Sequence, residues 1–149
     1  MGLEEDVFGA KVWFEQADHD LSVARKVFEL EEYYLVVFLC QQASEKALKS
    51  LGKILDIDTG KKHFLRSLLA LFPKEIASRI GDAAPGSADI DAYYLSSRYP
   101  DAFSDEVAPF RAFTREQAER TLDAANRIVQ VSGEILSELV GSALPDKQN

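Results

Sequence analysis

The run Tyr33–Cys40, with the sequence YYLVVFLC, constrains the fold most because it is apolar at every position. It opens a predicted helix over residues 31–56, whose second half is amphipathic. A helix that is apolar on all sides is typical of one surrounded by other helices. The run is far shorter than the roughly 20 residues that a membrane span needs. We therefore expect a buried central helix in a protein that does not span a membrane.

Apolar residues at helical spacing predict the elements around this helix. We expect helices over residues 11–29, 63–72 and 87–97, a further turn or two over 73–81, and a long last helix that begins at Thr114. Thr114 and Gln117 form a capping-box pair at its start, and the tail from Gly141 should fray. No segment keeps the alternation of a β-strand. The prediction is all-α: an up-and-down bundle of four to five helices.

Length and composition limit the classes of protein. A chain of 149 residues is expected to form one domain over residues 1–149. The net charge of −8 argues against a general DNA-coating protein, which needs positive charge. The single cysteine, Cys40, excludes a disulfide framework and a Cys-rich zinc site. Acidic residues stand where a signal segment would be basic, at positions 4–6. We expect a cytoplasmic protein with no metal and no cofactor.

Two polar residues interrupt the core stripe of the central helix. Gln41 and Glu45 share one face with the apolar residues Tyr34, Phe38 and Leu48. Burying an amide and a carboxylate without partners costs about 1–3 kcal/mol per group, and more for a charge. Either the stripe reaches the end of the bundle, where water enters, or the two residues belong to a polar network or a ligand pocket.

The same helix carries a basic face, formed by Gln42, Lys46, Lys49 and Lys53. Between Lys46 and Arg66 the chain has six Lys or Arg against two Asp. Such a cluster can bind phosphate locally on an acidic protein. The alternative is a solvated lysine face with pairing between Glu45 and Lys49.

The segment over residues 98–113 is long for a connection inside a small bundle. Arg98 stands at its start, where a guanidinium can grip a phosphate or carboxylate with two hydrogen bonds. Its aromatic residues could stack on a base or plug the segment onto the bundle; they are Tyr99, Phe103, Phe110 and Phe113.

Four motifs together resemble the HEPN domain (higher eukaryotes and prokaryotes nucleotide-binding). They are a D-L-x-x-A first helix (Asp20, Leu21, Ala24), QQASEKALK over residues 41–49, a third helix led by His63, and YYLSSRYPDA over 93–102. The resemblance covers about residues 10–138. It implies a helical bundle that is usually a homodimer. It also implies a nucleotidyltransferase partner or a toxin–antitoxin pair, because many small prokaryotic members are encoded beside a minimal nucleotidyltransferase.

Active members of this family are metal-independent endoribonucleases with an Arg, then four to six residues, then a His. Arg98 matches the arginine, but Phe103, Ser104 and Asp105 occupy the three histidine positions. Phenylalanine cannot transfer a proton, and loss of a general base commonly lowers a rate by about 10²–10⁴. Asp101 or His63 could substitute only if the fold brought one of them beside Arg98. The resemblance therefore favours a non-catalytic member.

The resulting hypothesis is a dimeric protein that binds a nucleotide or RNA phosphate, or docks on a nucleotidyltransferase. Arg98 and the lysines would hold phosphate, and Gln41 and Glu45 would orient Arg98 or a base edge. The expected site consists of Arg98, Tyr99, Asp101, Gln41, Gln42, Glu45, Lys46 and Lys49. Two alternatives remain: a ribonuclease toxin with a rearranged site, and a structural dimerisation module in which QQASEK and RYPD form a polar network across the interface.

Overall fold

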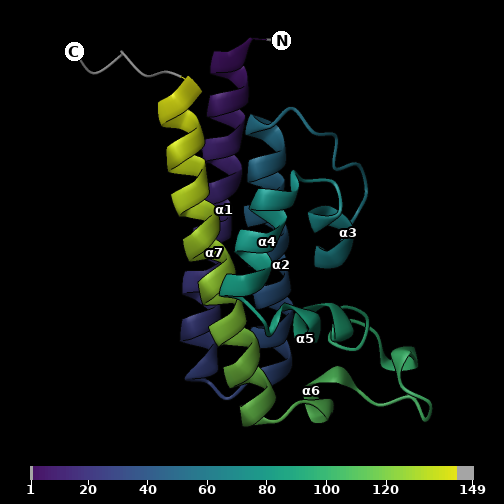
Figure 1. Ribbon diagram of the computed structural model, residues 1–149. Coiled ribbons are helices and arrows are strands. Elements are labelled where there is room, and N and C mark those ends of the chain that lie inside the picture. Colours follow the sequence, from purple (N-terminus) through teal and green to yellow (C-terminus); the bar gives the residue numbers. More distant parts are fainter. Residues whose placement is uncertain (1, 144–149) are drawn as a thin grey trace.

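Three long helices lie side by side in the computed structural model, which describes residues 2–143 (Figure 1). They are α1 (Leu3–Phe28), α2 (Tyr33–Ile54) and α7 (Arg115–Ala143). The chain between α2 and α7 forms α3 (Leu65–Leu69), α4 (Lys74–Ala83), α5 (Ser87–Ala92), the 3₁₀ turn η1 (Pro100–Ala102) and α6 (Pro109–Ala112). The all-α prediction is confirmed, since residues 2–143 contain no strand.

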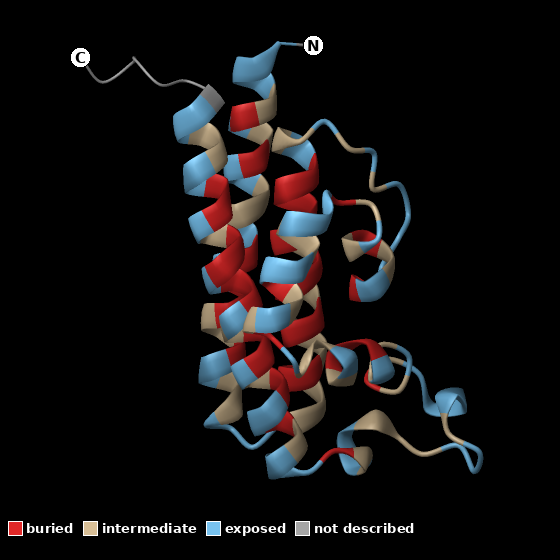
Figure 2. Ribbon diagram, viewed as in Figure 1, coloured by how far each residue is buried: buried red, intermediate tan, exposed pale blue. Residues whose placement is uncertain are grey.

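The core of the molecule lies along α2, as the sequence predicted. The apolar residues of α2 that are completely buried are Val36, Val37, Cys40, Ala43, Ala47, Leu48 and Leu51. Figure 2 shows this buried band running through the centre of the three long helices. Alanines 10, 17 and 24 of α1 and 118 and 125 of α7 are also fully buried, and their small side chains let the helices approach closely. None of the helices in residues 2–143 combines the length and apolar character of a membrane span.

Several helix boundaries differ from the prediction. The first helix begins at Leu3 rather than near Lys11, because Val7 and Ala10 are buried and extend its packed face. Acidic residues in its first turn interact favourably with the positive end of the helix dipole and so stabilise the start of the helix. The last helix continues to Ala143, so it includes the first three residues of the tail expected to fray from Gly141, and residues 144–149 lie outside the described part of the chain.

The helices in the middle of the chain are shorter than the spacing of apolar residues predicted. The helix expected over 63–72 is only α3, the predicted turns over 73–81 form α4, and the helix expected over 87–97 ends at Ala92. From Tyr93 to Tyr99 the backbone continues in hydrogen-bonded turns, such as Ser97 N–H to Tyr93 O and Tyr99 N–H to Leu95 O. These turns carry Tyr94 and Arg98 back towards α2.

The loop after α2 folds back against that helix at Gly52. A Cβ atom at Gly52 would come within 2.8 Å of Thr59 Cγ2 and 3.3 Å of the Ile57 carbonyl oxygen. The loop turns through left-handed conformations at Asp56 (φ 56°) and Gly60 (φ 53°). The absence of a side chain at position 52 therefore permits the close approach of the loop that leads to His63.

Asp91 ties this loop to α5. Its carboxylate accepts hydrogen bonds from the backbone N–H groups of Leu65 (2.6 Å) and Arg66 (3.0 Å) at the start of α3. Unpaired N–H groups at a helix start attract a carboxylate in this way. The contact fixes the segment carrying His63 relative to the segment carrying Tyr94.

Candidate functional site

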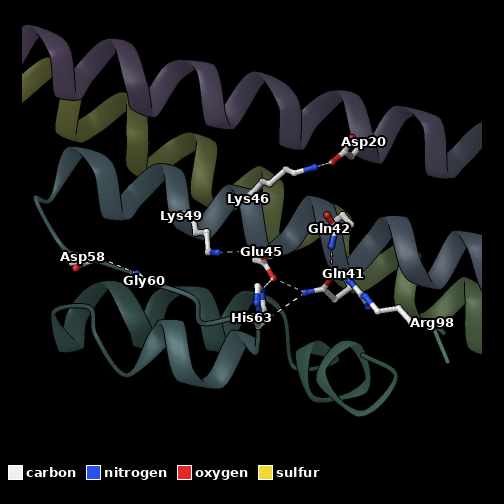
Figure 3. Close-up of polar contacts among 10 residues, drawn as sticks. All are labelled: Asp20, Gln41, Gln42, Glu45, Lys46, Lys49, Asp58, Gly60, His63 and Arg98. Atoms are coloured by element: carbon white, nitrogen blue, oxygen red, sulfur yellow. Dashed lines mark hydrogen bonds and ion pairs between the residues drawn. The ribbon is translucent and has the colours of Figure 1, made fainter. Parts of the chain in front are cut away.

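Gln41 lies at the centre of a polar network that joins three segments of the chain (Figure 3). Its side-chain oxygen accepts hydrogen bonds from Arg98 Nη2 (2.6 Å) and Gln42 Nε2 (2.9 Å). Its amide nitrogen donates to Glu45 Oε1 and to the His63 carbonyl oxygen, both at 3.0 Å. Gln41 is 1% exposed. The polar residues on the core face of α2 therefore belong to a specific hydrogen-bond network, rather than to a water-exposed end of the bundle.

Glu45 extends the network towards His63. Its Oε1 lies 3.1 Å from His63 Nδ1, and its Oε2 lies 3.3 Å from Lys49 Nζ. The side chains of Glu45 and Lys49 are each 10% exposed, whereas that of His63 is 47% exposed. The buried carboxylate is thus balanced by a buried ammonium group, and the imidazole at its other side reaches solvent.

Arg98 brings a positive charge into the same network without a carboxylate of its own. Its Nη1 donates to the Tyr94 carbonyl oxygen (2.7 Å), and its guanidinium lies over the rings of Tyr94 (4.0 Å) and Phe38 (4.5 Å). No ion pair joins Arg98 to a carboxylate within residues 2–143. Burial lowers the pKa of Arg98 from its usual value, and the guanidinium nevertheless stays charged near neutral pH.

An open groove of about 410 Å³ borders Arg98. It is lined by Tyr34, Leu35, Phe38, Ser97, Arg98 and Tyr99. Tyr99 is 52% exposed. The side chains of Arg98 and Tyr99 thus border the same open groove.

The basic face of α2 is largely neutralised. Lys46 Nζ lies 2.5 Å from Asp20 Oδ2 on α1, Lys49 pairs with Glu45, and the ammonium group of Lys53 lies 5.9 Å from the centre of the Trp13 ring. The structure thus has the paired arrangement, including the expected Glu45–Lys49 contact.

The exposed positive charge of this region lies instead in the loop after α2 and in the first turn of α3. Lys61, Lys62 and Arg66 are exposed on either side of His63, and none of them has an ion pair within the described residues. These residues belong to the basic cluster between Lys46 and Arg66 but were not among the site residues predicted from the sequence.

The segment over residues 98–113 divides into exposed and packed aromatic residues. Phe113 is buried and meets Tyr93 edge-on, with ring centres 5.3 Å apart, so it plugs the segment onto the bundle. Phe110 is 55% exposed. Asp101 is exposed on η1, and no hydrogen bond or ion pair within residues 2–143 connects it to Arg98.

Of the two substitutes for the missing histidine, the fold brings His63 into the network of Arg98. The His63 ring stacks on Tyr94 with centres 5.7 Å apart and an interplanar angle of 17°. Neither His63 nor Tyr94 was among the site residues predicted from the sequence. The sequence did contain one indication of this contact. Gln41 and Glu45 lie one helical turn apart on a buried face, so both needed a polar partner from another segment, which is His63.

Comparisons with known proteins agree with the helical architecture. A sequence model of the HEPN domain matches residues 10–136. The curated protein named "Putative toxin MJ1304" from Methanocaldococcus jannaschii is 25% identical over 139 residues, which cover 89% of this chain and 91% of that protein. The crystal structure of TT1696 from Thermus thermophilus matches with a TM-score of 0.74 and 34% identity over 84% of this chain and 96% of that one. The crystal structure of ST0689, an archaeal HEPN homologue, matches with a TM-score of 0.67 and 31% identity, over 85% and 97% of the respective chains.

Proposed function

Because the chain belongs to the HEPN domain family, we propose that it binds the phosphate of a nucleotide or an RNA strand through Arg98. The observation that carries this proposal is the charge state of the site. Arg98 is a partly buried cation whose direct partners are two neutral oxygen atoms and two aromatic rings. A charge removed from water is usually balanced by an opposite charge. A phosphate in the neighbouring groove would supply that charge.

The surrounding residues have distinct proposed roles. Gln41 and Gln42 orient the guanidinium, since Gln41 bonds directly to it and Gln42 bonds to the same oxygen of Gln41. Tyr99 offers an exposed ring on which a base can stack, a contact worth about 1–3 kcal/mol in single-strand binders. Asp101, exposed on the next turn, is available as an acceptor for a base amino group.

The two predicted site lysines act indirectly in this proposal. Lys46 and Lys49 neutralise Asp20 and Glu45, so that carboxylates do not repel an incoming phosphate. The charge of Lys49 also allows the Glu45 carboxylate to remain buried beside Gln41.

The proposed cellular setting is a toxin–antitoxin-like module in the cytoplasm. The name of the Methanocaldococcus relative supports the toxin side of such a module. We further propose a homodimer and a minimal nucleotidyltransferase as partners. Two exposed residues close to Arg98 in the chain, Leu95 and Tyr99, offer apolar surface for such contacts.

Titration of a fluorescein-labelled single-stranded RNA, and of AMP, tests the proposal. We expect Arg98→Ala to weaken binding about ten- to hundredfold, as loss of charged hydrogen bonds does. Arg111→Ala is the matched control, because Arg111 is exposed on the same segment and also lies over an aromatic ring, that of Phe110. Equal affinities for the wild type and Arg98→Ala would contradict the proposal.

Thermal melting of the same variants separates binding from a structural role. If the network serves only dimerisation or folding, Arg98→Ala lowers the melting temperature and the wild type binds neither probe. If Arg98 is a ligand-binding residue, Arg98→Ala loses affinity at a temperature where the variant is still folded.

A further inference from the structure

We propose that the exposed face of α1 around Phe8 binds a basic amphipathic helix of another protein. This surface consists of Phe8, Val12 and a neighbouring pocket between α1 and α2. It lies away from the Arg98 groove. That groove borders Phe38 of α2, whereas Lys53, beside the new surface, stands 15 positions further along the same helix, or about 22 Å at 1.5 Å per residue. The inference therefore goes beyond the proposed function.

The first argument is the exposure of large apolar side chains within a regular helix. Phe8 is 71% exposed, the highest value among the exposed large apolar residues of the described chain, and Val12 is 48% exposed. The two residues are one helical turn apart, so they lie on the same face of α1. A single exposed apolar residue is ordinary, whereas neighbouring ones that form a continuous patch mark a contact surface.

An open pocket of about 240 Å³ continues this apolar surface towards α2. It is lined by Val12, Trp13, Gln16 and Lys46. Figure 3 shows Lys46 reaching from α2 to Asp20 on α1, so an ion pair fixes the side of the pocket that Lys46 forms. Small-molecule sites usually enclose about 300–1,000 Å³. The smaller volume here suits one side chain of a partner that lies along α1.

Charge decides between a second copy of this chain and a different partner. Residues 2–18 contain a single lysine, Lys11, against five acidic residues: Glu4, Glu5, Asp6, Glu15 and Asp18. Glu4 precedes Phe8 by four positions and Glu15 follows it by seven, so both share its face. Two copies would bring these acids together, and each copy has a net charge of −8. Like charges oppose that contact, whereas a partner with Lys or Arg beside its apolar stripe is attracted.

The spacing of the apolar residues favours a helical partner. An amphipathic helix presents apolar residues every three or four positions, which matches the step from Phe8 to Val12. Laid along α1, such a helix places one apolar side chain in the pocket beside Trp13 and the next ones on Phe8 and Val12. The ammonium group of Lys53 lies 5.9 Å from the centre of the Trp13 ring, and Lys53 has no ion pair within residues 2–143. At that edge the partner helix carries no basic residue.

Trp13 supplies the signal for a test, because it is the only tryptophan of the chain and lines the pocket. The probe is a synthetic peptide of about 18 residues, or five turns, with leucines along one helical face and alanines and lysines on the others. The control peptide has the same composition in an order that spreads the leucines around the helix. We expect the first peptide to shift the Trp13 emission to shorter wavelengths in a saturable titration, and the control peptide to leave it unchanged.

Two substitutions with matched controls locate the binding surface. Phe8→Ser should weaken peptide binding about thirtyfold, the effect of losing an interface hot spot. Leu30→Ser removes a side chain that is equally exposed (70%) beyond the other end of α1, and should bind as the wild type does. Glu15→Lys should weaken binding about two- to fivefold, whereas Glu116→Lys, at an exposed position on α7, should not. All four positions are exposed, so we expect unchanged melting temperatures.

Equal affinities of the wild type and Phe8→Ser, or of the two peptides for the wild type, would overturn the proposal. A wild-type dimer in sedimentation that Phe8→Ser dissociates would also overturn it, because a second copy would then occupy the surface. The phosphate site is tested separately. Arg98→Ala should bind the peptide as the wild type does, and Phe8→Ser should bind AMP and RNA as the wild type does. Absence of AMP and RNA binding by the wild type contradicts only the proposed function.

Discussion

At the scale of single residues, Gln41 lies at the centre of the polar network because its side chain can hydrogen-bond to all four of its neighbours. The Gln41 amide donates two hydrogen bonds and accepts two, which a carboxylate or an aliphatic chain of similar size cannot do. We expect Gln41→Leu to lower the free energy of unfolding by about 1–3 kcal/mol, because it leaves Arg98 Nη2 and the His63 carbonyl oxygen without this partner. Urea denaturation measures the change. Gln42→Ala is the control, since Gln42 makes one bond and is only half-buried; equal losses would contradict a central role for Gln41.

The network was only partly predictable from the sequence at this scale. Helical spacing placed Gln41 and Glu45 on the core stripe and so indicated that they needed partners. It could not identify those partners, because His63 and Arg98 are 22 and 57 positions from Gln41 and are brought there by the loops. The predicted basic face was misleading for the same reason. Helical spacing places Lys46 on that face, but it does not reveal that Asp20 of α1 pairs with Lys46 and neutralises its charge.

At the scale of elements, two glycines should respond oppositely to the same substitution. Gly52→Ala places a methyl group against Thr59 Cγ2 and the Ile57 carbonyl oxygen, so we expect a loss of about 1–3 kcal/mol in the free energy of unfolding. Gly81→Ala lies within α4 with no atom within 4 Å, so it should gain about 0.5–1 kcal/mol from helix propensity. Thermal and urea melts of both variants check the signs.

A second substitution isolates the cause of the Gly52 effect. Thr59→Ser removes the Cγ2 methyl group that the new Cβ would meet, so it should restore part of the stability lost in Gly52→Ala. Full loss in the double variant would point to the backbone contact with Ile57 instead.

The helices were predicted best where the apolar period extends over many residues, as in α2 and α7. Short elements such as α6, which lies within the predicted connection, carry too few residues for a period to show.

At the scale of the whole molecule, Cys40 reports on the integrity of the bundle. Its thiol is completely buried in α2, and burial raises the pKa of that thiol well above its usual range. Because the thiolate is the reactive form, we expect almost no reaction with a thiol reagent in native buffer at pH 8, and rapid reaction once urea unfolds the chain. Ser104→Cys, at an exposed position, is the control and should react at once. Fast labelling of Cys40 in the native protein would contradict the packed core.

The segment between Ser97 and Phe113 contains no buried residue, although it includes Arg98 of the candidate site. A peptide bond cut within it would separate α1 and α2 from α7, yet the buried surfaces of those helices would still be in contact, so the two fragments should remain one particle. Insertions or deletions there also cost little loop entropy. Evolution can therefore alter this segment without refolding the protein, whereas Gln41 and Glu45 can change only together with the packing around α2.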